Sequence, residues 1–221
     1  TIQPYKEKLN WLITYLTTQL HKLGVEIHTG AAFDYGSLTD APDAVIVATG
    51  AQPLLEGFAG FAPDMVVTAE NVLLGTVKPR EQRVVVLGGH QVGCETAEFL
   101  VQRGNSVTVV ARSGPENLAE DAPRTYRIAL LGRLQRLGVS FITHHDVKEI
   151  RQGSMLLVDG DGKTQKLEAD LVVLARGYMP VNRIGEEIRG RVNEVYAIGD
   201  CVEPRDIAAA MYEGAWVASQ I

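Results

Sequence analysis

The sequence has few cysteines and no long apolar run, and each of these features excludes a class of protein. Its two cysteines, Cys94 and Cys201, lie far apart and form neither a CxxC pair nor a cluster with metal-ligand spacing. The apolar runs are all shorter than the roughly 18 residues that a transmembrane helix needs. The first residues do not resemble an export signal. We therefore expect two buried structural cysteines, no membrane partner and a cytoplasmic protein.

Positive charge is also scarce. The formal net charge is −6 and the isoelectric point is about 5.4. The Lys and Arg residues are scattered rather than clustered. A protein that binds the phosphate backbone of nucleic acid normally carries a basic patch. The charge therefore predicts that nucleic acid is not a partner.

Apolar residues and glycine are abundant instead. Hydrophobic residues make up 46% of the 221-residue chain, which is enough for one sizeable core or two small ones. Most of the 22 glycines stand at the ends of β-branched runs, where α/β proteins turn sharply. The composition therefore favours an α/β fold.

The first 50 residues predict a helix followed by strands. Leucines and an isoleucine recur at helical spacing across residues 4–23, with Pro4 in the first turn and Gly24 at the stop. Residues 25–28 (VEIH) form a candidate strand, and residues 44–48 predict a buried strand. This order is typical of an α/β protein.

A new pattern begins at residue 83. Strand 83–87, helix 93–103 and strand 106–111 form a βαβ unit, which requires parallel strands and a right-handed crossover. The later segments predict helix 124–137, strand 139–142, a meander of strands 147–150, 155–158 and 165–167, strand 169–175, strand 195–198, and helix 207–221 with Asp206 as its N-cap. We expect two α/β units, one of residues 80–178 inserted in another of residues 1–79 and 179–221.

The strongest motif is VVVLGGHQVGCETAEFL followed by GNSVTVVAR. Strand, glycine-rich turn, helix and second strand follow in the order of a dinucleotide-binding, Rossmann-like fingerprint. Gly88 is placed for the tight turn, and Gly93 for close packing of the helix against the strand. The helix N-terminus, from about Gln91, offers backbone amides and a positive dipole end to a pyrophosphate. The motif predicts a pyridine-nucleotide site.

Two residues depart from this fingerprint. His90 replaces the glycine that normally lets the pyrophosphate approach the backbone. Two interpretations follow: a βαβ unit kept for packing alone, or a histidine that folds outward and leaves its amide available. Arg112 stands where an acidic residue usually binds the adenine ribose, and an arginine can pair with a 2′-phosphate instead. The sequence thus slightly favours NADP over NAD.

Two further segments indicate a second nucleotide. Thr49 and Gly50 end one predicted strand, and Gly199 and Asp200 end another, which is where ligands of open α/β sheets bind. Asp200 is placed to accept a hydrogen bond from a ribityl hydroxyl, and the helix from Ile207 points its amides at the pyrimidine end of a flavin. Each segment alone is also explained as a turn. Together, and in this order, they predict FAD.

The order of the motifs ATG, GGHQVGCETA, ARGYMPVN, AIGDC and EGA resembles the C-terminal region of the NADH:flavin oxidoreductase and 2,4-dienoyl-CoA reductase family, relatives of Old Yellow Enzyme. The resemblance covers essentially the whole chain. It implies an FAD domain with an inserted NAD(P) domain, preceded by a TIM barrel that holds FMN and an iron–sulfur cluster. It implies that NAD(P) is served by Gly88, Gly89 and Gly93, that Gly177 lies near the nicotinamide, and that FAD is served by Thr49, Gly50, Gly199 and Asp200.

Some parts of that family cannot be placed on this sequence: the barrel, the four-cysteine cluster motif and the first FAD-binding βαβ unit. We therefore expect a detached nucleotide-binding piece of a flavin-dependent oxidoreductase, an incomplete FAD domain that is inactive alone and retains FAD weakly or not at all. An open sheet edge should then be exposed. The expected partners are pyridine nucleotide, the remainder of the parent enzyme, and a second copy that covers the open sheet.

In the intact enzyme, hydride would pass from NAD(P)H to FAD, and no side chain of this region is needed as acid, base, nucleophile or metal ligand. Two other functions stay open. One is a relative similar to trimethylamine dehydrogenase, whose inserted domain has lost the pyridine nucleotide. The other is a non-enzymatic module that docks onto partner subunits through its open edge.

Overall fold

The chain forms two compact units. The computed structural model describes residues 6–34, 36, 42–55 and 63–221. A larger unit contains residues 1–19 and 55–176, and a smaller unit contains residues 20–54 and 177–221. The sequence placed the start of the inserted unit at residue 80. The structure places it earlier, because a strand at residues 66–68 belongs to the sheet of the larger unit.

The larger unit is built on a five-stranded sheet with the order β3-β10-β4-β5-β6, in which all neighbours are parallel. Its strands are β3 (Val66–Thr68), β4 (Arg83–Leu87), β5 (Ser106–Val110), β6 (Ser140–Ile142) and β10 (Leu171–Leu174). The predicted parallel-sheet, Rossmann-like α/β class is confirmed. Sequence reasoning missed β3, because three residues are too few to show a strand pattern.

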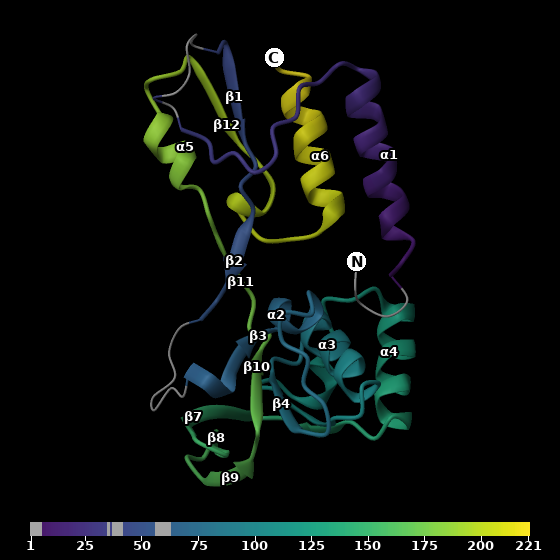
Figure 1. Cartoon of the computed structure of the whole chain (residues 1–221). Helices are drawn as coiled ribbons and strands as arrows, with labels where there is room; N and C mark the ends of the chain where they lie inside the picture. The colour runs from purple at the N-terminus through teal and green to yellow at the C-terminus, as the bar shows by residue number, and fades with distance from the viewer. Residues whose placement is uncertain (1–5, 35, 37–41, 56–62) are drawn as a thin grey trace. The chain divides into compact units, whose positions relative to one another are not determined.

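Helices cover one face of this sheet and a meander covers the other (Figure 1). The helices are α2 (Ala69–Leu73), α3 (Gln91–Val101) and α4 (Arg124–Arg136), and a short 3₁₀ helix, η3 (Pro115–Asn117), lies in the loop before α4. The antiparallel meander consists of β7 (His145–Arg151), β8 (Ser154–Asp159) and β9 (Thr164–Glu168). All three meander strands were predicted.

Strand β4 shows why its sequence is apolar throughout. Val84 and Val86 belong to the core beneath the helices, whereas Val85 and Leu87 belong to the core beneath the meander. Each of these four side chains is at most 2% exposed. A strand buried on both faces shows a continuous apolar run rather than alternation.

The smaller unit contains two short strand pairs. Strand β1 (Ala44–Val47) pairs in parallel with β12 (Glu194–Ala197), and β2 (Ala51–Pro53) pairs antiparallel with β11 (Tyr178–Pro180). The unit also contains α5 (Arg183–Ile188), the 3₁₀ helix η4 (Gly199–Cys201) and α6 (Ile207–Ala218). The Asp206 carboxylate accepts a hydrogen bond from the Ala209 amide at 2.8 Å. This confirms the predicted N-cap of α6.

Helix α1 (Leu9–Lys22) confirms the first predicted helix. Gly24 follows it with a φ of +70°, as expected of a residue that ends a helix, whereas Pro4 lies outside the described residues. The prediction of a strand at residues 25–28 is wrong. Val25 and Ile27 are 47% and 43% exposed. A strand needs a neighbouring strand for its backbone hydrogen bonds, and none of the described residues pairs with this segment.

None of the described helices is long and apolar enough to cross a bilayer.

One exposed carboxylate ties the start of β4 to the start of β10. Asp170 accepts hydrogen bonds from the Arg83 guanidinium at 2.6 and 3.0 Å and from the Arg83 amide at 2.8 Å. These bonds lower the pKa of Asp170 to about 2. A carboxyl group whose pKa is lower in the folded than in the unfolded chain stabilises the fold above its unfolded pKa. That stabilisation is lost as the pH falls through the folded value.

We predict that Asp170→Asn removes this contribution. The difference in Tm between wild type and variant should be full at neutral pH and should shrink as the pH falls from about 4 to about 2. Thermal unfolding followed by circular dichroism at a series of pH values measures it. Asp161→Asn is the matched control, because the exposed Asp161 side chain has no partner in the described part of the chain. A difference that stays constant down to the lowest pH would contradict the prediction.

Candidate functional site

The glycines of the β4–α3 turn let three backbone segments approach one another closely. Gly88 has a φ of +127°, and a Cβ atom there would lie 2.1 Å from the carbonyl oxygen of Ala175. A Cβ atom on Gly93 would lie 2.0 Å from the carbonyl oxygen of Gly88. On Gly89 it would meet two neighbouring side chains at 2.8 Å. This is the geometry predicted for a tight turn and for close packing of helix on strand.

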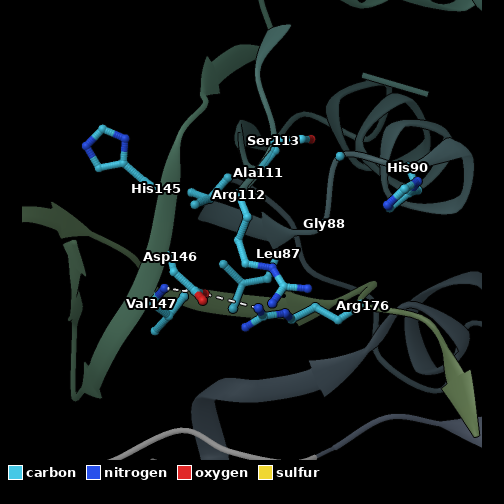
Figure 2. A pocket seen from close by; sticks show the side chains of 12 residues that line it. Leu87, Gly88, His90, Ala111, Arg112, Ser113, His145, Asp146, Val147 and Arg176 are labelled. Carbon is cyan, nitrogen blue, oxygen red and sulfur yellow. Dashed lines mark hydrogen bonds and ion pairs between the residues drawn. The ribbon is translucent and has the colours of Figure 1, made fainter. Parts of the chain in front are cut away.

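A cavity of about 190 Å³ lies at the carboxyl ends of β4 and β5 (Figure 2). Its lining comes from the β4–α3 turn, the end of β5, the start of β7 and the residue before Gly177. The lining residues are Leu87, Gly88, Gly89, His90, Val110, Ala111, Arg112, Ser113, His145, Asp146, Val147 and Arg176. Four predicted site residues, Gly88, Gly89, His90 and Arg112, are therefore brought together. Ligands of open α/β sheets bind at this edge of the strands.

Two arginines line this cavity from different strands (Figure 2). Arg112 follows β5, and no carboxylate pairs with it among the described residues. Arg176 follows β10, its side chain is 19% exposed, and its guanidinium lies 3.1 Å from the carboxylate of Asp146. The cavity thus combines the glycine turn at one end with one unpaired and one paired guanidinium group.

The N-terminus of α3 holds a carboxylate of the chain itself. His90 is the N-cap residue, makes no capping hydrogen bond, and has a side chain that is 56% exposed. The amide of Gln91 donates to Asp121 Oδ1 at 2.7 Å, and His90 Nδ1 lies 3.6 Å from the same oxygen. The imidazole therefore lies outward, in line with the second interpretation of His90. The adjacent amide, however, already has an acceptor.

Two buried carboxylates on α3 are saturated by donors and do not line the cavity. Glu95 is 2% exposed and accepts hydrogen bonds from Lys6 Nζ at 2.8 Å, Gln91 Nε2 at 2.8 Å and Tyr126 OH at 2.7 Å. Glu98 is 1% exposed and pairs with the Arg133 guanidinium at 2.5 Å. A buried charge is tolerated when it is paired in this way. Both residues are explained by structure alone.

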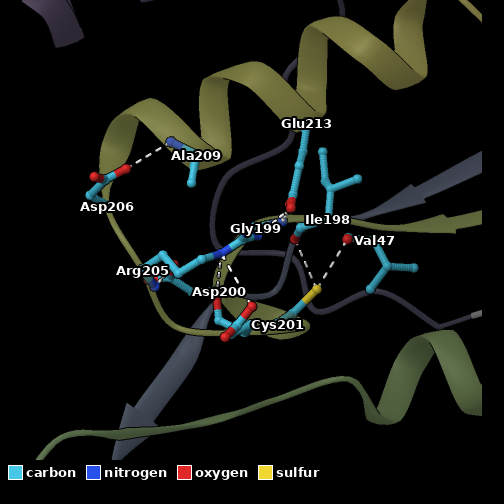
Figure 3. A network of polar contacts seen from close by, with 10 residues as sticks. Val47, Ile198, Gly199, Asp200, Cys201, Arg205, Asp206, Ala209 and Glu213 are labelled. Carbon is cyan, nitrogen blue, oxygen red and sulfur yellow. Dashed lines mark hydrogen bonds and ion pairs between the residues drawn. The ribbon is translucent and has the colours of Figure 1, made fainter.

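Both cysteines are buried, as predicted. Burial, together with the charges of Asp121 and Glu95, raises the pKa of Cys94 to about 12. A thiol with this pKa stays protonated at neutral pH and is a poor nucleophile. The Cys201 thiol donates to the carbonyl oxygens of Val47 and Ile198 (Figure 3).

The second set of predicted residues gathers at one sheet edge of the smaller unit. Thr49 and Gly50 follow β1, and Gly199 and Asp200 follow β12. Because β1 and β12 are parallel neighbours, these four residues lie at the same carboxyl edge. Gly177 directly follows Arg176 but is not itself a lining residue of the cavity, and its carbonyl oxygen accepts a hydrogen bond from the Leu54 amide at 3.0 Å.

Hydrogen bonds hold the loop between η4 and α6 (Figure 3). Asp200 accepts from the Arg205 amide at 3.1 Å, and the Gly199 amide donates to Glu213 at 2.6 Å. The Arg205 guanidinium also binds Glu213. This hydrogen bond and the one from Gly199 lower the pKa of Glu213. The Glu213 carboxylate thus holds the glycine that begins η4, two residues after β12.

Sequence reasoning missed the cavity residues that come from other elements: Ser113, His145, Asp146, Val147 and Arg176. Only Arg176 had a usable signal, because it directly precedes Gly177 in ARGYMPVN. Among the described residues, no group of three or more His, Cys, Asp or Glu side chains is arranged to hold a metal ion.

A second hollow of about 170 Å³ lies beside the amino end of β4, with Lys78, Arg80 and Arg103 among its lining residues. Arg103 donates to the Phe99 carbonyl oxygen at 3.1 Å, near the C-terminus of α3. A cation is favoured there by the helix dipole. We therefore assign Arg103 a structural role.

Comparison with known proteins gives one family and several relatives. The chain matches the family described as "Pyridine nucleotide-disulphide oxidoreductase" over residues 16–214. NADH oxidase of Thermoanaerobacter brockii is 34% identical over 99% of this chain and 34% of its own length. Bilirubin reductase of Mediterraneibacter gnavus is 33% identical over 97% of this chain and 33% of its own length. A solved complex of 2-naphthoyl-CoA reductase superposes with a TM-score of 0.90 at 26% identity, over 100% of this chain and 33% of that one. The chain therefore spans about a third of the length of these relatives.

We predict that Gly93→Ala lowers the free energy of unfolding by about 2 kcal/mol or more, because the new Cβ would overlap a backbone carbonyl that cannot move aside. Urea unfolding measures this change. Gly132→Ala is the control: its Cβ would meet only the end of the Arg136 side chain, at 3.6 Å, within α4. There alanine should raise the free energy of unfolding by roughly 0.5–1 kcal/mol. Equal effects of the two substitutions would rule out the close contact.

Proposed function

The chain belongs to the pyridine nucleotide-disulphide oxidoreductase family, and from this premise we propose that it is the nucleotide-binding part of an enzyme in which NAD(P)H donates a hydride to FAD. Domains of this family are flavin-dependent oxidoreductase domains that bind FAD and NAD(P). Because the chain spans about a third of the length of its relatives, we assign the substrate chemistry to the remainder of a parent enzyme.

The proposal rests on one observation: the glycine turn of the fingerprint and an unpaired arginine line the same cavity. The glycine-constrained turn at Gly88 and Gly89 lies at one end, and the unpaired Arg112 lies on the next strand. An anion with two charged parts fits this combination, since amides at a helix N-terminus and a guanidinium group both bind phosphate. A βαβ unit kept for packing alone needs the glycines but not the unpaired arginine.

In this proposal the β4–α3 turn binds the pyrophosphate through its backbone amides, and the positive end of α3 adds a favourable field. Arg112 binds the 2′-phosphate of NADP(H), which makes NADP the preferred nucleotide. The apolar walls at Val110 and Ala111 contact the adenosine. The Arg176 guanidinium pairs with the Asp146 carboxylate, so this pair adds no net charge to the wall of the cavity.

For FAD, we assign the shared carboxyl edge of β1 and β12. Thr49, Gly50, Gly199 and Asp200 fit this role because their backbone and carboxylate groups lie at the same edge. One carboxylate oxygen of Asp200 accepts a hydrogen bond from the Arg205 amide. The other is left for a ribityl hydroxyl. The hydroxyl of Thr49 donates to the Val181 carbonyl and holds the loop.

We also propose that the remainder of the parent enzyme covers the exposed apolar side chains of the smaller unit, with a homodimer as the alternative. Ile46 in β1 is 44% exposed, and Met211 and Trp216 in α6 are 46% and 53% exposed. Large apolar side chains exposed on both β1 and α6 support an interaction surface in this unit.

A second candidate function is a degenerate pyridine-nucleotide site, as in a relative similar to trimethylamine dehydrogenase. The N-terminus of α3 favours this candidate. His90 replaces a glycine there, and the Gln91 amide already donates a hydrogen bond to Asp121. This candidate requires that neither NADPH nor NADH binds.

We predict that the chain binds NADPH more tightly than NADH and that Arg112→Gln removes this preference. The dissociation constant of NADPH should rise about tenfold or more, because a hydrogen-bonded ion pair is lost, while that of NADH should change little. Nucleotide fluorescence or calorimetric titration at two salt concentrations measures both constants. Arg124→Gln is the matched control, since this arginine starts α4 outside the cavity. Equal loss for both nucleotides would exclude a 2′-phosphate contact, and binding of neither would favour the degenerate site.

A further inference from the structure

The first turn of α3 has donors that need an acceptor. The leading amides of a helix have no partner within it, and in α3 these belong to Gln91, Val92 and Gly93. In the described part of the chain, the amides of Val92 and Gly93 have no acceptor, whereas Gln91 donates to Asp121 Oδ1 at 2.7 Å. A protein carboxylate therefore already holds one amide at the end of α3 that faces the glycine turn.

The loop that carries Asp121 is fastened to the glycine turn. The amide of Ala119 donates to the Gly89 carbonyl oxygen at 2.7 Å. Ala119 itself is fully buried and adopts a φ of +50°, which a residue with a side chain takes up only where its surroundings enforce it. The Arg127 guanidinium binds the Leu118 carbonyl oxygen at 2.6 Å. These hydrogen bonds fix the loop and thereby position the Asp121 carboxylate at the Gln91 amide.

The charge of Asp121 has consequences for any anion at this position. A hydrogen bond from an amide to a carboxylate is charge-assisted and strong, and the positive end of the helix adds to it. A pyrophosphate that approaches the same amide must displace the carboxylate or bind beside a like charge. His90 stands where the fingerprint has a glycine. Its Nδ1 lies 3.6 Å from Asp121 Oδ1, so an imidazole also neighbours this oxygen.

We propose that Asp121 is an internal competitor of the dinucleotide pyrophosphate and sets the affinity of the site. The inference rests on the proposed function and adds a residue that determines how tightly this chain binds its nucleotide. The carboxylate holds the end of α3 in the absence of nucleotide, and binding includes the exchange of one anion for another at the Gln91 amide. Asp121 lies 30 residues from that amide in the sequence and outside the residues that line the cavity.

The test compares Asp121→Asn with wild type in the full 221-residue chain. Asparagine keeps a side-chain oxygen that can accept the hydrogen bond from the Gln91 amide. The first turn of α3 is therefore preserved while the negative charge at position 121 is lost. The dissociation constant of NADPH should fall about tenfold at low salt, and the gain should shrink as salt rises. Asp121→Ser, which also removes the charge, should change affinity in the same direction.

Glu120→Gln is the matched control. It removes the same charge from the same loop. The Glu120 carboxylate, however, accepts a hydrogen bond from Asn117 Nδ2 at 2.6 Å and not from the Gln91 amide. Its effect on the dissociation constant should stay within about twofold. A readout without nucleotide is the amide proton of Gln91 in nitrogen–proton correlation spectra. It should move upfield in Asp121→Asn, and inorganic pyrophosphate should shift it at lower concentration than in wild type.

Three results would overturn the inference. If wild type binds NADPH and neither Asp121 variant binds it more tightly, the competitor role is wrong and the proposed function stands. If Glu120→Gln gives the same gain as Asp121→Asn, the effect is one of overall charge and not of the contact with Gln91. If neither wild type nor any variant binds NADPH or NADH, the inference and the proposed function fail together.

Discussion

The site depends on one steric constraint, the contact between the backbones of β4, α3 and the end of β10. Gly88 and Gly93 make it possible, because a Cβ atom at either position would lie about 2 Å from a carbonyl oxygen. The contact packs the first turn of α3 directly against the sheet. It also leaves the amides of this turn at the carboxyl edge, beside the cavity that reaches Arg112. The same two residues therefore serve the packing and the site.

Local patterns predicted the parallel βαβ unit, the meander and the final helix, because each of these elements carries its own periodicity and turn residues. The strand expected at residues 25–28 failed for a physical reason: β-branched residues favour a strand, but a strand exists only with a partner. The site residues likewise fall into those that sequence patterns predicted and those that they did not. Gly88, Gly89 and His90 were predictable as one contiguous motif. Arg176 had only an indirect signal, its place beside Gly177 in ARGYMPVN. Asp121 had none, since the topology and not the spacing in the sequence brings it to the turn.

The cavity is lined by two arginines and one carboxylate, in a chain whose net charge is −6. The buried carboxylates of α3, Glu95 and Glu98, are neutralised by their own donors and stay out of the cavity. What an incoming nucleotide meets is a balance: the helix amides and Arg112 attract phosphate, and Asp121 repels it. The histidine that stands in place of a glycine at position 90 also takes part, since its exposed imidazole lies 3.6 Å from the Asp121 carboxylate.

Titration of NADPH into the isotope-labelled chain, with every backbone amide followed by NMR, shows directly whether the glycine turn receives a dinucleotide. We expect saturable shifts concentrated at Gly88, Gly89, Gln91 and Arg112, around the cavity of the larger unit. Saturable shifts that cluster elsewhere, or no shifts at millimolar nucleotide, would contradict the claim that this glycine turn receives a dinucleotide.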